Sequence, residues 1–258
     1  MGVSMKTVLI TGASSGIGSA LAHEYNHHGF RLILAARRHD RLEELARKLA
    51  QPVHTICTDI ADGATLQAAL ADLPSVFRDI DILVNNAGVT IGEGPVHERK
   101  LEDWNTMIDT NIRGLIQCTR MVLPGMVHRG NGHIVNLGST AGSYPRPGNP
   151  IYCASKAFGT QFSLALRADL HGTGVRVTSI EPGTVQDTEL AINRVGGDVS
   201  RLAEIYADYE YLTPEDIART IVWCTAMPSH VNINRIDLMA TCQTFSNLSS
   251  KRRKAVPA

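Results

Sequence analysis

The sequence lacks several features that mark large classes of protein. It has no excess of either charge, with 25 lysine and arginine residues against 25 aspartate and glutamate residues. A net charge of zero argues against a general affinity for nucleic acid or anionic membrane. No uninterrupted apolar run is long enough to span a bilayer. The first residues lack the apolar core of a signal peptide, and Lys6 departs from the myristoylation pattern.

Cysteine is scarce and scattered. The cysteines are Cys57, Cys118, Cys153, Cys224 and Cys242, and none of them forms a Cys-x-x-Cys pair. Their odd number and wide spacing indicate reduced thiols rather than disulfides or a zinc site. We therefore expect a cytoplasmic protein that uses no metal.

Strand and helix patterns alternate along all 258 residues, without a linker or an internal repeat. The expected strands are 7–11, 31–36, 53–58, 81–85, 133–137, 175–180 and one within 234–239. The expected helices run from the first turn to about 29, then 40–49, 62–77, 101–129, 150–171 and 213–226. This alternation predicts one α/β domain over residues 1–258, a doubly wound, seven-stranded parallel sheet with helices on both faces. We expect a short helical lid at about 186–211 and a tail from about 240.

A glycine-rich turn follows the first strand, with the sequence Gly12-Ala-Ser-Ser-Gly16-Ile-Gly18. A glycine cluster alone is only a turn, but strand, glycine turn and helix together are the context of a dinucleotide site. Glycines let the backbone approach a pyrophosphate, and the helix N-terminus supplies amide donors. We expect a phosphate-binding turn here.

The end of the second strand indicates which cofactor is bound. NAD-selective folds often carry an acidic residue at this position to hold the ribose 2′-hydroxyl. Here Ala36 is followed by Arg37 and Arg38. Two guanidinium groups suit a 2′-phosphate, which favours NADP over NAD. Of the two, Arg37 is the expected contact because it is nearer to the strand end. The alternative is that both arginines merely begin an exposed helix.

Polar side chains follow the later strands. Asp59 comes after the third strand and is expected either to accept a hydrogen bond from an adenine amino group or to cap the next helix. Asn86 follows the fourth strand, and Ser139 follows the fifth. Open α/β sheets bind ligands beyond the carboxyl ends of their strands. Asn111 interrupts an apolar helical stripe, so it is either a satisfied core amide or a site residue.

Tyr152 and Lys156 stand four residues apart in the helix that opens near Pro150. This spacing puts both side chains on one helix face. A neighbouring ammonium group stabilises a phenolate and lowers the pKa of a tyrosine, which makes the pair a usable acid–base device. Taken alone, the pair is better explained as a chance feature of an amphipathic helix, and only the motifs before it favour the acid–base role.

These motifs, taken in order with Pro182-Gly183, resemble the short-chain dehydrogenase/reductase family, whose members have a Rossmann fold. The resemblance implies that Tyr152 is the acid and base, that Lys156 lowers its pKa and binds the nicotinamide ribose, that Ser139 holds the substrate oxygen, and that Asn111 keeps a water in a proton relay. It implies direct hydride transfer without a metal. The expected cofactor residues are Gly12, Ser14, Ser15, Gly16, Ile17, Gly18, Arg37, Arg38, Asp59, Ile60, Asn86, Ala87, Gly88, Tyr152, Lys156, Pro182, Gly183, Thr184, Val185 and Thr188.

Further segments, such as 80–88, 102–111 and 230–234, resemble the NADP-dependent 3-hydroxy acid dehydrogenases, also called serine dehydrogenases. That branch acts on serine, 3-hydroxyisobutyrate, 3-hydroxypropionate and related small acids, and the family is usually tetrameric. A small anionic substrate needs a cation in the pocket. Arg194 in the expected lid matches an arginine of this branch, and Arg146 is a second candidate; either arginine could instead face solvent.

Two other functions remain open from the sequence. The chain could reduce an uncharged ketone, a sugar or a carrier-bound 3-oxoacyl group, in which case Arg194 would be irrelevant. It could also be a nucleotide-sensing protein that has kept the fold and lost the chemistry, although the full catalytic set is present.

Overall fold

In the computed structural model, residues 5–92, 95–194 and 197–245 are described, and they contain one sheet of seven parallel strands. The spatial order of the strands is β3-β2-β1-β4-β5-β6-β7. Their bounds are β1 (Thr7–Thr11), β2 (Arg31–Ala36), β3 (Val53–Cys57), β4 (Ile80–Asn85), β5 (Gly132–Leu137), β6 (Val175–Pro182) and β7 (Arg235–Leu238). The predicted doubly wound parallel sheet is confirmed.

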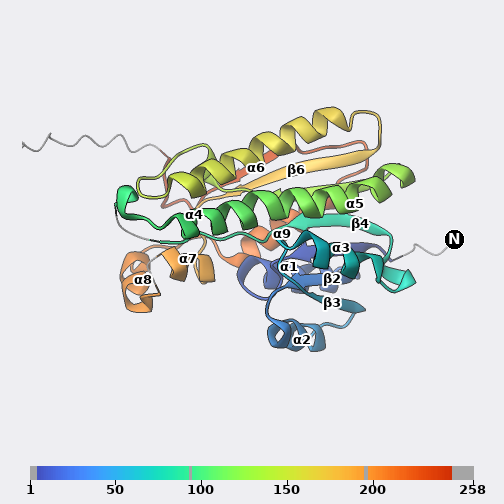
Figure 1. Ribbon diagram of the computed structural model, residues 1–258, viewed down its shortest axis with the longest axis horizontal. Coiled ribbons are helices and arrows are strands. Elements are labelled where there is room, and N and C mark those ends of the chain that lie inside the picture. Colours follow the sequence, from blue (N-terminus) through green and yellow to red (C-terminus); the bar gives the residue numbers. More distant parts are fainter. Residues whose placement is uncertain (1–4, 93–94, 195–196, 246–258) are drawn as a thin grey trace, which may run out of the picture.

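Helices cover both faces of this sheet (Figure 1). They are α1 (Gly16–His27), α2 (His39–Arg47), α3 (Gly63–Ala71), α4 (Leu101–Ile108), α5 (Leu115–Arg129), α6 (Pro150–Asp169), α7 (Glu189–Arg194), α8 (Val199–Tyr206) and α9 (Pro214–Thr225). Buried side chains of α1, α2 and α9 pack on one face, and those of α3, α5 and α6 pack on the other. The strands read as nearly continuous apolar runs because both of their faces are buried.

The direction of strand order reverses between β1 and β4, which are neighbours in the sheet. In an open α/β sheet this switch point leaves a crevice at the carboxyl ends of the strands, where ligands bind. The glycine turn after β1, the Asn86 turn after β4 and Ser139 after β5 therefore approach one another. Each comes from a different part of the chain, and the sheet alone brings them together.

Two of the expected helices are interrupted. The helix expected over 62–77 ends at Ala71, and a separate turn of 3₁₀ helix spans Ser75–Phe77 after Pro74. Proline lacks an N–H and disfavours helical backbone in the residue before it. The helix expected over 101–129 consists of α4, a π-helical segment over Asp109–Gly114 and α5.

The expected helical lid corresponds to α7 and α8, which lie close together at one end of the molecule (Figure 1). Thr213 begins α9 with a capping box, in which its hydroxyl accepts from the N–H of Asp216 and its own N–H donates to the Asp216 carboxylate. In the described part of the chain, no helix combines the length and apolar character that crossing a bilayer requires.

Candidate active site

The turn after β1 is shaped by its glycines. Gly12 and Gly16 have φ angles of 65° and 49°, which side chains rarely adopt. A Cβ on Gly18 would lie 2.7 Å from the amide nitrogen of Asn86. That nitrogen donates to the carbonyl of Thr11 at 2.8 Å, so Asn86 fastens the end of β4 to the turn. The turn is thus held tightly against the sheet, with the start of α1 behind it.

A cleft of about 280 Å³ opens over this turn. Every residue expected to bind the cofactor lines it, except Gly18 and Thr184. Gly18 instead packs behind the turn, and Thr184 lines a neighbouring cavity. The cleft is also lined by residues that the sequence did not single out, among them Val89, Thr110, Glu189, Leu190 and Asn193.

The two arginines after β2 take different positions in the cleft. The Arg38 guanidinium donates to the hydroxyls of Ser14 and Ser15 at 3.0 and 2.9 Å and pairs with Glu189 of α7 at 2.6 Å. Arg37 is more exposed and lies 3.7 Å from the carboxylate of Asp59. Hydrogen bonds from Arg38, and weaker ones from Arg41 and Ser15, lower the pKa of Glu189 to about 2, although burial acts in the opposite direction. Arg38 therefore lies directly over the glycine turn.

Asp59 does not cap the helix that follows it. Its carboxylate accepts from the N–H of Ala61 at 2.9 Å, while Asp62 is the N-cap of α3 and accepts from the N–H of Thr65. Of the two roles expected for Asp59, the capping role is wrong. The carboxylate remains in the wall of the cleft, beside Arg37.

Tyr152 and Lys156 share one face of α6 at the inner end of the cleft. The Lys156 ammonium lies 5.8 Å from the centre of the Tyr152 ring and donates to the carbonyl of Leu137 at 2.7 Å. Lys156 is 7% exposed. Burial lowers its pKa to about 8, and the nearby charge of Glu181 acts in the opposite direction. The lysine is thus held beside the phenol and is charged at neutral pH.

Asn111 is placed by the π-helical segment. Its side-chain oxygen accepts from the N–H of Val89 at 2.8 Å, and its nitrogen donates to the Val89 carbonyl and to the Ser155 hydroxyl. A Cβ on Gly88 would lie 3.3 Å from the Lys156 nitrogen and 3.4 Å from the Asn111 oxygen. Asn111 and Lys156 therefore flank the same small space, which a side chain at position 88 would fill. π-Helical turns recur at functional sites.

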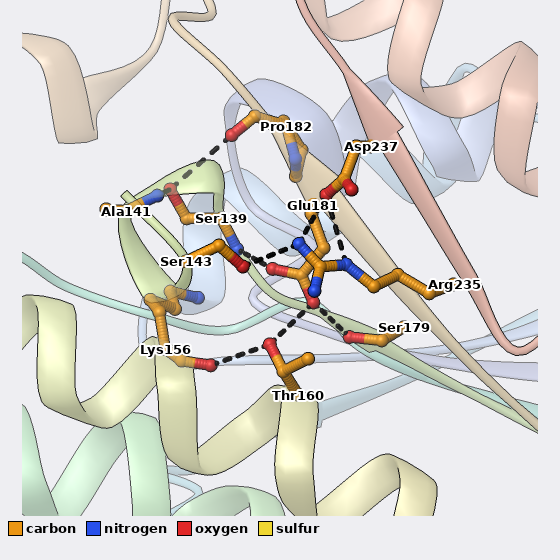
Figure 2. A network of polar contacts seen from close by, with 10 residues as sticks. All are labelled: Ser139, Ala141, Ser143, Lys156, Thr160, Ser179, Glu181, Pro182, Arg235 and Asp237. Atoms are coloured by element: carbon orange, nitrogen blue, oxygen red, sulfur yellow. Dashed lines mark hydrogen bonds and ion pairs between the residues drawn. The ribbon is translucent and has the colours of Figure 1, made fainter. Parts of the chain in front are cut away.

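Glu181 connects the end of β5 with α6 through a network of polar contacts (Figure 2). This side chain of β6 is fully buried. One carboxylate oxygen accepts from the N–H of Ser139 at 2.8 Å. The other accepts from the hydroxyls of Thr160 on α6 and Ser179 on β6 at 2.7 and 2.5 Å. A buried carboxylate needs such donors, and here they fix the end of β5 to α6. Glu181 is therefore a positioning residue for Ser139.

A second cavity, of about 290 Å³, adjoins the cleft. Ser139 and Tyr152 line both spaces, so the two spaces meet at these side chains. Arg146 lines the second cavity, and so does Arg99, which the sequence analysis did not consider. Arg194 ends α7, but its side chain lies outside the described part of the structure.

Sequence reasoning missed Glu181 and Arg99 as site residues. Glu181 did carry a signal, because a carboxylate at the end of a strand of the central sheet is expected to be buried and is then costly without partners. Arg99 carried none, since it lies in a polar connection of ordinary composition between β4 and α4.

The glycine turn, the cleft at the strand switch point and the tyrosine–lysine pair where that cleft meets a second cavity define a nucleotide-dependent oxidoreductase. The chain belongs to the short chain dehydrogenase family, whose model matches residues 6–196. A protein of Salmonella typhi named NADP-dependent 3-hydroxy acid dehydrogenase is 49% identical over 245 residues, which are 95% of this chain and 99% of that protein. A serine 3-dehydrogenase of Agrobacterium fabrum is 47% identical, over 95% of this chain and 98% of that protein.

The fold agrees with these relatives. The solved structure of the closed form of a serine dehydrogenase with NADP+ is 45% identical to this chain, with a TM-score of 0.91. The two structures match over 96% of this chain and over 100% of the serine dehydrogenase chain. The expected family and the narrower likeness to 3-hydroxy acid and serine dehydrogenases are both confirmed.

Proposed function

We propose that the protein is an NADP-dependent dehydrogenase that interconverts a small 3-hydroxy acid and the corresponding 3-oxo acid. The observation that carries this proposal is the junction of two spaces at Ser139 and Tyr152, one over a dinucleotide turn and the other lined by arginine. The names of the relatives from Salmonella typhi and Agrobacterium fabrum support the same substrate class.

The residues of the cleft suit NADP. Gly12 and Gly18 have no room for a side chain, and glycines at such positions let the backbone of the turn approach a pyrophosphate. Arg37, with Arg38 beside it, supplies positive charge where a 2′-phosphate would lie. When bound, the cofactor supplies or accepts the hydride, and no metal takes part. The nicotinamide end of the cofactor is bordered by Pro182, Gly183, Val185 and Thr188. NAD is the weaker alternative to NADP as the cofactor.

The reacting carbon binds beside Ser139 and Tyr152 in this proposal. The Ser139 hydroxyl donates to the substrate oxygen, while Tyr152 gives a proton to that oxygen in reduction and takes it back in oxidation. The Lys156 ammonium stabilises the phenolate form of Tyr152. Asn111, on the far side of the space next to Gly88, positions the water that returns protons from solvent to Lys156.

The carboxylate of the substrate requires a cation in the second cavity. Arg146 lines this cavity, and Arg194 remains a candidate from the sequence. The test is kcat/KM with NADP+ for 3-hydroxypropionate and for its methyl ester. A charge-assisted contact is worth ~1.5–3 kcal/mol, so we expect the free acid to be preferred by roughly ten- to a hundredfold. An ester that equals the acid would contradict the hydroxy-acid assignment and favour a reductase of uncharged ketones.

We further propose a homotetramer in the cytoplasm. Exposed apolar side chains on α5 and α6, including Ile116 and Leu164, together with the stacked rings of Phe158 and Phe162, suit packing against another copy. Light scattering coupled to gel filtration measures the assembly, and a monomer would contradict this part of the proposal.

A further inference from the structure

The connection between β4 and α4 carries Arg99 into the wall of the second cavity. One terminal nitrogen of its guanidinium donates to the carbonyl of Ile91 at 2.9 Å. The other donates to the carbonyl of Gly148 at 2.7 Å. Ile91 belongs to the loop after β4, and Gly148 belongs to the loop before α6. Arg99 therefore joins the two loops that enclose the cavity.

These two contacts fix the guanidinium without neutralising it. A guanidinium has five N–H groups, and the two carbonyls use one on each terminal nitrogen. Each terminal nitrogen keeps a second N–H, and the buried Nε has no partner among the described residues. Carbonyl oxygens carry no net charge, and no carboxylate of residues 5–92, 95–194 and 197–245 forms an ion pair with Arg99. The side chain is a positive charge held in one orientation with hydrogen bonds to spare.

The described lining of the cavity carries positive charge and no carboxylate. None of the described residues that line it is aspartate or glutamate, whereas Arg99 and Arg146 both line it. Ser139 and Tyr152 line the same cavity as Arg99, so one small molecule in this cavity could place an oxygen at those two side chains and an anionic group at Arg99.

We propose that Arg99 binds the carboxylate of the substrate and is the main determinant of the preference for acids over uncharged alcohols. This inference rests on the proposed function and assigns the residue that binds the carboxylate of the acid. A fixed planar fork matches the two oxygens of a carboxylate and loses little freedom on binding, which is the advantage of arginine over lysine at such a site.

Removing the charge gives the test. Arg99→Met keeps an unbranched, flexible side chain and abolishes its charge and its donors. Arg99→Lys keeps the charge and loses the fork. With NADP+, we expect Arg99→Met to lower kcat/KM for 3-hydroxypropionate ten- to a hundredfold, mainly through KM. The value for the methyl ester should stay within about threefold, and Arg99→Lys should fall between. Arg219→Met, at an exposed position on α9, is the matched control and should change neither substrate.

The ester separates anion binding from a merely structural role. If Arg99 only fastens the two loops, Arg99→Met and Arg99→Lys lower the activity on acid and ester alike, and the inference is overturned. A wild-type protein that prefers the acid and keeps that preference in Arg99→Met overturns the inference while leaving the proposed function intact. A wild-type protein without preference for the acid contradicts the proposed function itself.

Discussion

Exchange of Glu181 for glutamine should move the alkaline limb of the pH–rate profile to lower pH. Glutamine has nearly the same shape, and its oxygen can still accept from the N–H of Ser139. The hydroxyls of Thr160 and Ser179 can rotate to accept from the new NH₂ group. The exchange therefore keeps the position of Ser139 and removes the negative charge that opposes the deprotonation of Lys156.

The size of the effect follows from the positions of the two charges. Lys156 donates to the carbonyl of Leu137, and Glu181 accepts from the N–H of Ser139, two residues further along. A neighbouring opposite charge shifts the pKa of a group by roughly one unit or more. The pKa of Lys156, about 8 in the wild type, should fall by that amount.

The assay is kcat for oxidation of 3-hydroxypropionate with NADP+ from pH 6 to pH 10. The alkaline limb reports the loss of the Lys156 ammonium. Asp237→Asn is the matched control, because Asp237 pairs with Arg235 and contacts neither Ser139 nor Lys156. An alkaline limb that stays in place in Glu181→Gln would show that Glu181 does not tune the lysine.

Four further results are expected. Tyr152→Phe should keep NADP+ affinity and lose most of kcat, and a normal kcat would refute its role as acid and base. Arg37→Ala should raise the Kd for NADP+ at least tenfold and leave that for NAD+ nearly unchanged, because the other guanidinium, that of Arg38, is already paired with Glu189. An equal loss of affinity for both cofactors, measured by calorimetry, would contradict the assignment of the 2′-phosphate site. Gly88→Ala should lower kcat by roughly tenfold with an unchanged melting temperature, because its Cβ would press on Lys156 and Asn111. Burial lowers the pKa of His133 to about 3 in the folded protein. Between about pH 6.5 and pH 3, this histidine is therefore protonated in the unfolded chain and neutral in the folded one. Stability should thus fall on acidification, by about 2 kcal/mol between pH 7 and pH 5 for this group, and urea unfolding of His133→Gln should show a shallower fall.

Much of the fold could be predicted because its signals are local. Alternating apolar strands and helices with glycine turns define the parallel sheet, and the order of the strands in space follows from the handed crossovers of such folds. The start of α6 at Pro150 could also be predicted, since proline suits the first turn of a helix. The π-helical segment could not be predicted, because the apolar stripe around Asn111 continues as it would in a regular α-helix.

The site was predictable only as far as its chemistry sits in short motifs. The spacing of Tyr152 and Lys156 and the glycines of the turn can both be recognised in the sequence. The partners of Glu181 lie up to 42 residues away, and Arg99 meets Gly148 across 49 residues. Contacts of that kind depend on how elements pack, which no local pattern records.

Helix α7 forms part of the wall of both spaces: Glu189 and Asn193 face the cofactor cleft, Ala191 faces the second cavity, and Leu190 lines both. A ligand in either space restrains the same six residues. The second ligand then meets a helix that is already ordered, so its own binding costs less conformational entropy. Cofactor and substrate should consequently raise each other's affinity by the same factor, whichever of them arrives first.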